Sequence, residues 1–343
     1  MNRKFLSLFS LLALTLTSCG SEAKKIAQVF IFDETDPFMI SLSKSLNYIF
    51  QGTVESNFKY AERNQNTQNS QIIEALKDPS TKILVLNMVD RLAASAIIEL
   101  AYKKNVPVVF INREPLKSDL YPTNTESEDA KWIAKNCYYV GSDAKSEGLK
   151  QAEIADSYFV SKGGFASSSL DKNGDGKIQI GLLKGEEGHQ DSEERSKYCI
   201  QGLTEKGYAV DLVSTAYANW DAAQAEDKMA TFPIDTIELL YSNNDAMAIG
   251  ASNYLIKKLS DPEKSILDAF FPIIGVDGTK DGKVAVDQHR LLGTVTNDNN
   301  LQASIIYRVV AHFIFGSDLP EYFTNTTTDG RYFYVSGGIY NGK

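Results

Sequence analysis

VPVVFIN, at residues 106–112, and FPIIGVD, at residues 271–277, are the stretches that decide the fold. Each is a short apolar run that ends in one polar residue, Asn112 in the first and Asp277 in the second. An uncharged apolar run of this length predicts a strand that is buried on both faces. Each run also follows a similar unit, LNMVDRLAASA from residue 86 and YSNNDAMAIGA from residue 241. The repeat predicts two sheets of the same kind.

Strands alternate with helices on both sides of these runs. In the first half we expect strands at residues 26–32, 58–62, 82–87 and 106–111, and helices at 36–50, 66–76 and 92–104. In the second half we expect strands at 178–185, 210–214, 237–241, 271–276, 291–296 and 332–337, and helices at 144–159, 190–206, 221–229, 246–259 and 301–315. This alternation predicts parallel sheets covered by helices on both faces. The fold class is therefore α/β, with two doubly wound parallel-sheet lobes.

Composition excludes several classes of protein. The chain has 343 residues, of which 43% are apolar and 23% charged, as in a soluble protein of two ordinary domains. Its 35 basic and 44 acidic residues give a net charge of −9, which argues against a nucleic-acid partner. After the N-terminal segment, no apolar run is long enough to span a membrane.

Residues 1–19 read as an export signal. A basic start is followed by a mostly apolar run and by Leu16-Thr17-Ser18-Cys19, which looks like a bacterial lipobox. Cleavage there would leave Cys19 as a lipid-bearing N-terminus, so we expect lipidation at Cys19 and a periplasmic, membrane-anchored protein. The alternative is an ordinary secretory signal with an incidental cysteine. Of the two remaining cysteines, Cys137 and Cys199, we expect buried free thiols, although one disulfide is also possible in an oxidising compartment.

Polar residues gather at the predicted strand ends, where the ligands of open α/β sheets bind. These residues are Asp36, Asn112, Asn244, Asp277 and Asn297. His189, Asp191 and Arg195 lie at one strand-to-helix junction, and Phe38 and Trp220 are the aromatic candidates. Planar groups that form paired hydrogen bonds, together with two aromatic rings, suit a sugar. They suit a nucleotide poorly, since the chain has no glycine-rich phosphate loop.

Each of these residues also has a plainer interpretation. His189 could cap a helix, and Asp191 and Arg195, four positions apart, could form a surface pair that contributes little to stability. Trp220 could be a core aromatic, and Asn297 a turn residue. Their positions at equivalent ends of two repeated sheets favour a binding site.

DKNGDGKIQ, at residues 171–179, has the ligand spacing of a calcium loop. Asp171, Asn173, Asp175 and Gln179 supply side-chain oxygens, and Lys177 supplies its carbonyl oxygen. An EF-hand would carry a glutamate at the twelfth position, which is a leucine here, so the last carboxylate must come from elsewhere in the chain. The alternative is a polar turn, because Asp, Asn and Gly favour turns for local reasons.

Together these residues resemble the glucose/galactose-binding branch of the type I periplasmic binding proteins of bacterial sugar transport. The resemblance covers residues 26–337. It is carried by DPFM (36–39), VPVVFINREP (106–115), YYVGSD (138–143), DKNGDGKIQ (171–179), LLKGEEGH (182–189), WDAAQAEDKM (220–229), NNDAMAIGA (243–251), GVDG (275–278) and GTVTND (293–298). Nine matching segments in the same order make a specific match.

The resemblance implies a role for each site residue. Sugar contacts would fall on Asp36, Asn112, His189, Asp191, Arg195, Asn244, Asp277 and Asn297, with the sugar ring between Phe38 and Trp220. Calcium ligands would fall on Asp171, Asn173, Asp175, Lys177, Gln179 and, as the distant carboxylate, Glu238. The protein would be a monomer that delivers glucose or galactose to the permease of an ABC transporter, and a chemoreceptor is a further possible partner.

The resemblance also implies a three-crossing hinge, which we place near residues 141–142, 298 and 330. The N-terminal lobe would then hold residues 25–141 and 298–330, and the C-terminal lobe residues 142–297 and 331–343. The chain departs from the family pattern at its lipobox, at GFASSSL before the calcium loop and at YFTNTTTDG from residue 322. The last crossing and the identity of the sugar are therefore less defined than the class of the ligand.

Three other functions are alternatives to sugar delivery. A glycosidase needs two carboxyl groups about 5 to 10 Å apart across one bond, but the neighbours of Asp36, Asp191 and Asp277 suit recognition better. A sugar-sensing repressor of the same fold needs an N-terminal DNA-binding helix pair, and this chain begins with an export signal. A subunit that presents its sugar to a chemoreceptor cannot be distinguished from a transport protein by sequence.

Overall fold

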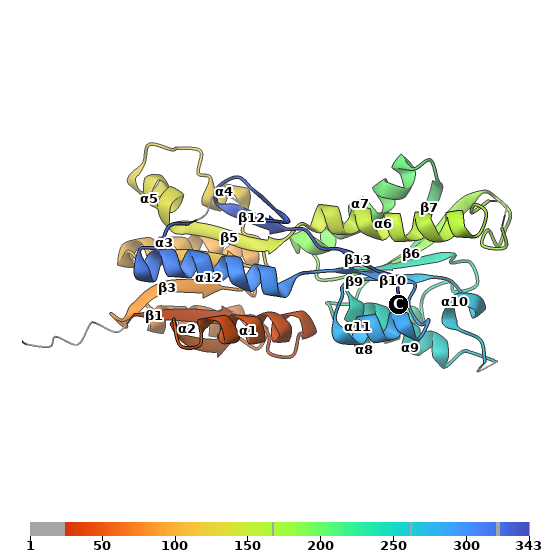
Figure 1. The fold of residues 1–343 in the computed structure, drawn as a ribbon, viewed down its shortest axis with the longest axis horizontal. Helices are drawn as coiled ribbons and strands as arrows, with labels where there is room; N and C mark the ends of the chain where they lie inside the picture. Colours follow the sequence, from red (N-terminus) through yellow and green to blue (C-terminus); the bar gives the residue numbers. More distant parts are fainter. Residues whose placement is uncertain (1–24, 167, 261–262, 320–322, 343) are drawn as a thin grey trace, which may run out of the picture.

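The computed structural model describes residues 25–166, 168–260, 263–319 and 323–342, so the predicted leader with Cys19 lies outside the described residues. The described chain forms two α/β lobes side by side (Figure 1). The first lobe contains a seven-stranded sheet in the order β11-β12-β5-β4-β3-β1-β2, and the second a six-stranded sheet in the order β13-β10-β9-β8-β6-β7. Among the described strands, the antiparallel pairs are β11 with β12 and β13 with β10. The predicted fold class is confirmed.

The bounds of the elements follow the predicted alternation. The first lobe contains β1 (Ile26–Ile31), α1 (Pro37–Phe50), β2 (Glu55–Tyr60), α2 (Gln65–Ala75), β3 (Thr81–Leu86), the short helix η1 (Arg91–Ala93), α3 (Ala94–Lys104), β4 (Val108–Ile111), α4 (Lys117–Leu120), α5 (Glu128–Asn136), β5 (Cys137–Ser142), α12 (Asn299–Phe315), β11 (Thr326–Thr328) and β12 (Tyr332–Val335). The second contains α6 (Ala144–Ser161), β6 (Lys177–Lys184), α7 (Gln190–Glu205), β7 (Ala209–Tyr217), α8 (Ala222–Met229), β8 (Leu239–Ser242), α9 (Asp245–Ile256), α10 (Ile266–Ala269), β9 (Ile273–Asp277), α11 (Lys280–Asp287), β10 (Gly293–Thr296) and β13 (Ile339–Tyr340).

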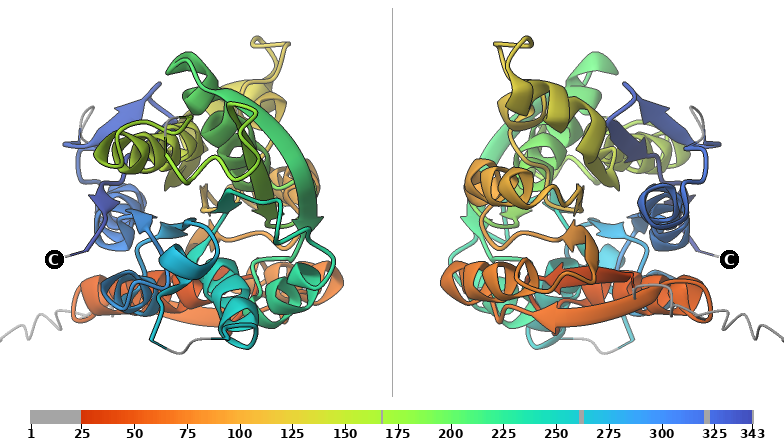
Figure 2. Two further views of the ribbon diagram at one scale, coloured as in Figure 1. Left: turned by 90° about the vertical axis from the view of Figure 1, so that its right-hand side faces the viewer. Right: turned by 90° about the vertical axis from the view of Figure 1, so that its left-hand side faces the viewer.

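Each sheet is buried on both faces, as its apolar strands predict. In the first lobe, Val109 and Ile111 of β4 pack toward α1 and α12, whereas Val108 and Phe110 pack toward α2 and α3. The second sheet divides its side chains in the same way between α8, α9 and α11 on one face and α6 and α7 on the other. Figure 2 shows the helices around the sheets in end-on views. Full burial of one such aliphatic or aromatic side chain contributes about 1.5 to 3 kcal/mol, so these faces fix the register of the strands.

The chain crosses between the lobes at three places. β5 passes into α6 at Asp143, and β10 passes into α12 at residues 297–298. The predicted third crossing near residue 330 and the assignment of residues 331–335 to the second lobe are wrong, whereas β13 pairs with β10 in the second lobe as expected. β12 pairs with β5 in the first sheet, so the chain crosses after it, at residues 336–338 (Figure 1). A Cβ at Gly337 would lie 1.5 Å from the carbonyl oxygen of Thr296, so only glycine fits where two crossings touch.

The four-residue helices α4 and α10 were not predicted from the sequence, and neither were two longer helices, α5 and α11. Both are short and mostly polar, and α11 contains Gly282, which lowers helix propensity. Packing explains the glycine, because a Cβ at Gly282 would lie 2.0 Å from the carboxylate of Asp245. The same carboxylate accepts hydrogen bonds from Thr279, the N-cap of α11, at 2.7 and 3.0 Å. A tertiary contact therefore places this helix.

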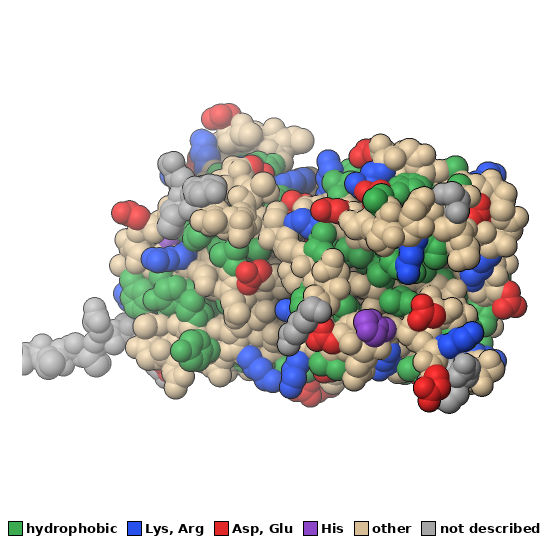
Figure 3. Space-filling view, turned by 45° about the vertical axis from the view of Figure 1, so that its right-hand side comes forward, with side chains coloured by type: hydrophobic (Ala, Val, Ile, Leu, Met, Phe, Trp, Pro, Cys, Tyr) green, Lys and Arg blue, Asp and Glu red, His purple; other side chains and the backbone are tan. Residues whose placement is uncertain are grey.

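The surface carries both signs of charge. On the face that Figure 3 shows, basic and acidic side chains are interspersed, which is the surface expected for a protein of moderate negative charge. Within the described part of the chain, no helix is both long enough and apolar enough to span a membrane.

Candidate functional site

A cavity between the two lobes brings together nine of the ten predicted sugar-contacting residues. It is lined by Phe32, Asp36, Phe38, Asn112, Arg113, His189, Asp191, Arg195, Trp220, Asn244 and Asp277. The first five residues belong to the first lobe and the other six to the second. Only Phe32 and Arg113 were not predicted. The cavity lies where the carboxyl ends of the two sheets face each other, as expected for open α/β sheets.

Three of the lining residues are helix N-caps. Asp36 Oδ1 accepts the backbone N–H of Met39 at 2.9 Å at the start of α1. His189 Nδ1 accepts the N–H of Asp191 at 3.2 Å before α7, and Asn244 Oδ1 accepts the N–H of Met247 at 2.9 Å before α9. The helix ends are thereby satisfied. The caps also orient the second oxygen of Asp36, the ring Nε2 of His189 and the amide of Asn244.

Asn112 and Asp277 end their strands with unusual backbone angles. Their φ values are 60° and 109°, in the region that non-glycine residues rarely adopt. Such a conformation costs on the order of 1 to 3 kcal/mol and tends to occur at functional sites. Sheet-edge hydrogen bonds stabilise it, because Asn112 donates to the carbonyl of Val140 at 3.0 Å and the carbonyl of Asp277 accepts from Asn297 at 2.9 Å.

Trp220 and Phe38 are the aromatic residues of the cavity from opposite lobes, and each is 7% exposed. The Trp220 backbone also has a positive φ, 64°. A Cβ at Gly185 would lie 2.2 Å from the Trp220 ring, so glycine at this position makes room for the indole. The His189 and Trp220 rings pack in a T-shaped arrangement, with ring centres 5.0 Å apart and planes at 72°. These contacts hold Trp220 in one orientation.

Burial sets the ionisation of the cavity side chains. Loss of water raises the pKa of Asp277 well above its usual range, and the pKa of Asp36 and Asp191 is also raised. Arg195 opposes this shift at Asp191 and Asp277, because its guanidinium lies 3.2 Å from Asp191 Oδ2 and 4.0 Å from Asp277 Oδ1. Burial lowers the pKa of His189, so its imidazole is neutral at pH 7. Since Nδ1 accepts a hydrogen bond, Nε2 carries the proton and can donate it to a ligand.

Asn297 is the one predicted sugar contact that does not line the interlobe cavity. It lines an adjoining pocket that shares Phe38 and Asp277 with the first. Its side chain is directed by its neighbour on α12, because Gln302 Nε2 donates to Asn297 Oδ1 at 2.6 Å. Its Nδ2 is buried and has no partner among the described residues.

Arg113 forms an ion pair between the lobes that was not predicted from the sequence. Its guanidinium donates to both carboxylate oxygens of Glu186, at 2.7 and 2.9 Å, and stacks 3.9 Å from the centre of the Phe32 ring. It also donates to the carbonyl of Val89 at 2.6 Å. Arg113 follows the predicted residue Asn112 directly, but no local pattern connects it with a glutamate 73 positions away.

Hydrogen bonds to its own side chains hold the backbone of the predicted calcium loop. Asp171 accepts the N–H groups of Gly174 and Gly176 at 2.8 and 2.9 Å. The N–H of Lys177 donates to Asp175 at 2.8 Å and holds the pKa of this exposed carboxyl below its usual value. Both loop glycines have φ 73°, which other residues rarely adopt.

Glu238 is the carboxylate that reaches this loop from a distant part of the chain. It is 2% exposed and accepts the N–H groups of Lys172 at 2.5 Å and Gln179 at 3.1 Å. Gln179 Oε1 is buried and has no partner among the described residues. Across the same residues, no group of three or more His, Cys, Asp or Glu side chains converges as a metal site. The donors are all oxygens, and an unpartnered buried oxygen fits a hard cation.

The cysteines Cys137 and Cys199 are free and buried, as expected. They lie on β5 and α7, and burial raises the pKa of both thiols. Such thiols are unreactive packing residues.

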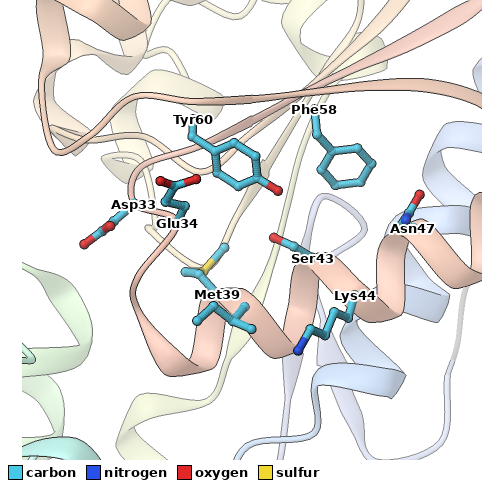
Figure 4. Close-up of a pocket in the computed structure, with 9 residues that line it drawn as sticks. Asp33, Glu34, Met39, Ser43, Lys44, Asn47, Phe58 and Tyr60 are labelled. Carbon is cyan, nitrogen blue, oxygen red and sulfur yellow. The ribbon is translucent and has the colours of Figure 1, made fainter.

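A separate hollow lies within the first lobe, between α1 and β2 (Figure 4). Figure 4 shows Phe58 and Tyr60 of β2 across from Ser43 and Met39 of α1. This hollow shares no lining residue with the interlobe cavity. Because it belongs to one lobe, movement of the lobes does not form it.

The chain is similar in sequence to periplasmic and import binding proteins. Residues 36–318 match the family described as periplasmic binding protein domain. The chain is 32% identical over 318 residues to a D-galactose/methyl-galactoside binding periplasmic protein of Haemophilus influenzae, covering 90% of this chain and 88% of that one. It is 22% identical over 296 residues to a ribose import binding protein of Escherichia coli, covering 85% and 86%.

A solved structure shares the fold. It is an ABC transporter periplasmic solute binding protein from Actinobacillus succinogenes with bound D-allose. The TM-score is 0.70 at 16% sequence identity, and the match covers 93% of this chain and 98% of that one.

Proposed function

This chain belongs to the periplasmic binding protein family, whose members are solute-binding transport proteins and not enzymes, and we propose that it delivers a monosaccharide to an ABC transporter. The proposed ligand is glucose or galactose, held in the interlobe cavity. The observation that carries the proposal is the convergence of nine planar polar or aromatic residues from both lobes on that one cavity.

The chemistry of the cavity supports a neutral polyol. The carboxylates can accept hydrogen bonds from sugar hydroxyls, His189 Nε2 and Arg195 can donate them, and Asn112 and Asn244 can do both. Trp220 and Phe38 offer faces for the C–H groups of a sugar ring. Galactose is favoured by the H. influenzae relative, which covers most of this chain. Glucose differs from galactose at one hydroxyl, and a carboxylate such as Asp36 can accept a hydrogen bond from either epimer through one of its two oxygens.

A panel of sugars tests this proposal. A ligand that binds only the folded state stabilises it by about 2.7 kcal/mol at a hundred times its Kd, which raises Tm measurably. The panel contains D-glucose, D-galactose, D-ribose, D-allose and myo-inositol. We expect D-glucose or D-galactose to raise Tm the most. L-glucose is the control for nonspecific stabilisation. A larger shift with ribose, allose or inositol would keep the transport role and replace the ligand.

Closure of the lobes around the sugar gives the transporter a form to recognise. A ligand shifts the open–closed equilibrium only by its differential affinity for the two forms. A sugar that contacts Asp36 on one lobe and Asp277 on the other has such a preference. The Arg113–Glu186 pair contributes to the same closed form, because its partners come from different lobes.

Glu186→Gln should therefore speed sugar release. The two side chains are 5% and 28% exposed, so we expect a loss of about 1 kcal/mol from the closed form and about fivefold faster dissociation. Stopped-flow fluorescence of Trp220 measures this rate. Glu187→Gln, an exposed neighbour, is the matched control. Equal rates in wild type and Glu186→Gln would show that the pair does not stabilise the closed form.

Calcium is the proposed structural ion of the 171–179 loop. Asp171, Asn173, Asp175, Gln179 and Glu238 would hold it through side-chain oxygens, and Lys177 through its carbonyl. The buried carboxylate of Glu238 and the unpartnered Oε1 of Gln179 support this. The ion would join the loop before β6 to the residue just before β8.

Lipid attachment at Cys19 is proposed from the lipobox alone, with anchoring to a bacterial membrane. Cys19→Ala is expected to abolish incorporation of a labelled fatty acid, since a thiol is the acceptor. Metabolic labelling in a bacterial host measures it, with Cys137→Ala as the control. Undiminished labelling of Cys19→Ala would exclude this residue as the anchor.

A further inference from the structure

Glu147, in the first turn of α6, is a fully buried carboxylate that the proposed sugar contacts do not include. Its Oε2 accepts Nε–H of Arg195 at 2.6 Å, and the two side chains are 0% and 3% exposed. Close packing of α6 on α7 makes this contact possible. A Cβ at Gly148 would lie 2.8 Å from the carbonyl oxygen of Arg195 and 3.0 Å from the backbone nitrogen of Cys199.

Glu147 contacts Arg195 from the side away from the cavity, because Arg195 lines the cavity and Glu147 does not. Nη1 of Arg195 donates to the carbonyl of Asn243 at 2.8 Å, and Nη2 lies 3.2 Å from Asp191 Oδ2. Nη2 also donates to Ser142 Oγ at 3.4 Å, so one N–H of Nη1 remains for a ligand. The bond to Glu147 is the one that fixes Nε, and with it the plane of the guanidinium.

The charge around Glu147 is unbalanced. Arg195 is the cation in contact with it, whereas Asp143 of α6, Asp191 of α7, Asp277 at the end of β9 and the phenol of Tyr139 on β5 face the same region. Burial raises the pKa of Glu147 to about 7, and the attraction of Arg195 opposes this rise. Its second oxygen, Oε1, is buried without a partner among the described residues.

We propose that Glu147 is a positioning residue, which holds the Arg195 guanidinium toward the sugar and couples sugar affinity to its own ionisation. This inference rests on the proposed function. The ionised carboxylate makes a charge-assisted hydrogen bond to Nε, whereas the protonated acid makes a weaker one. Sugar affinity should therefore be highest above the pKa of Glu147 and fall as pH decreases through about 7.

Glu147→Gln tests the coupling, since the amide keeps the shape and the acceptor but cannot ionise. Isothermal titration of D-glucose and D-galactose from pH 5.5 to 8.5 measures Kd for wild type, Glu147→Gln and the control Glu153→Gln, an exposed position on the same helix. We expect about tenfold weaker binding in Glu147→Gln at pH 8 and nearly equal binding at pH 5.5. The same change in affinity near pH 7 in wild type and in Glu147→Gln would overturn the proposal. A glutamate with a merely structural role would not change the pH dependence of Kd.

A second measurement does not depend on any sugar. Carbon NMR of the labelled Glu147 carboxyl should show a titration near pH 7 in the free protein, shifted upward in Arg195→Met, which removes the cation. A midpoint near the ordinary value, or no shift in Arg195→Met, would overturn the proposal. If no sugar binds the wild type at all, the proposed function fails, and this titration still decides whether the two side chains are coupled.

Discussion

Asp277→Ala is expected to weaken sugar binding by about thirty- to a thousandfold, which corresponds to a loss of roughly 2 to 4 kcal/mol. Asp277 is 8% exposed, and among the described residues Arg195 is the cation that pairs with its carboxylate, at 4.0 Å. Its hydrogen-bonding capacity is therefore open to the ligand. Arg195 opposes the rise that burial causes in the pKa of Asp277, and an ionised acceptor that bonds to sugar hydroxyls contributes more than a neutral one. Calorimetric titration measures the loss.

The matched control for this prediction is Asp227→Ala, an exposed aspartate on α8 of the same lobe. It should bind sugar as the wild type does. Circular dichroism and Tm of Asp277→Ala check that the variant is folded, since removal of a buried carboxylate beside Arg195 also changes stability. Wild-type affinity in a folded Asp277→Ala would show that the second lobe contacts the sugar elsewhere.

Glu238→Gln is expected to reduce calcium affinity by at least a hundredfold and to remove the effect of chelation on stability. The variant replaces a carboxylate, which attracts a divalent cation strongly, with a neutral amide of the same shape. A metal that binds only the folded state stabilises that state by mass action. EDTA should thus lower the Tm of the wild type by several degrees and leave Glu238→Gln almost unchanged.

Scanning calorimetry with EDTA, and then with added Ca²⁺ or Mg²⁺, measures this difference. Ca²⁺ should restore the wild-type Tm, whereas Mg²⁺ should restore it poorly, because a nine-residue loop with a distant carboxylate suits the larger ion better. The same decrease with EDTA in both proteins would show that Glu238 holds no metal. No decrease in the wild type would refute the calcium site itself.

The sequence predicted the features that depend on local pattern. Apolar strands that end in Asn112 and Asp277 placed the two sheets, and both residues line the interlobe cavity as expected from the rule for open α/β sheets. His189 and Asn244 have two roles at once, because each caps a helix and also lines the cavity. Capping and ligand binding thus do not exclude each other, because a cap uses only one atom of the side chain.

Features that depend on contacts between distant residues could not be predicted. The Arg113–Glu186 pair joins two lobes, and Glu147 reaches Arg195 only because Gly148 lets two helices approach. β12 looked like a strand of the second lobe by its position in the chain, yet its buried side chains pack in the first. Hydrophobic periodicity shows that a segment is buried, but not in which lobe.

Calorimetric titration of the chain from residue 20 with D-glucose and with D-galactose tests the central claim most directly. We expect one binding site per chain, with micromolar or tighter affinity for at least one of the two sugars. Binding should be weakened both by Asp36→Ala on one lobe and by Asp277→Ala on the other, since one sugar contacts both walls of the cavity. No heat of binding with either hexose at millimolar concentration would contradict the account.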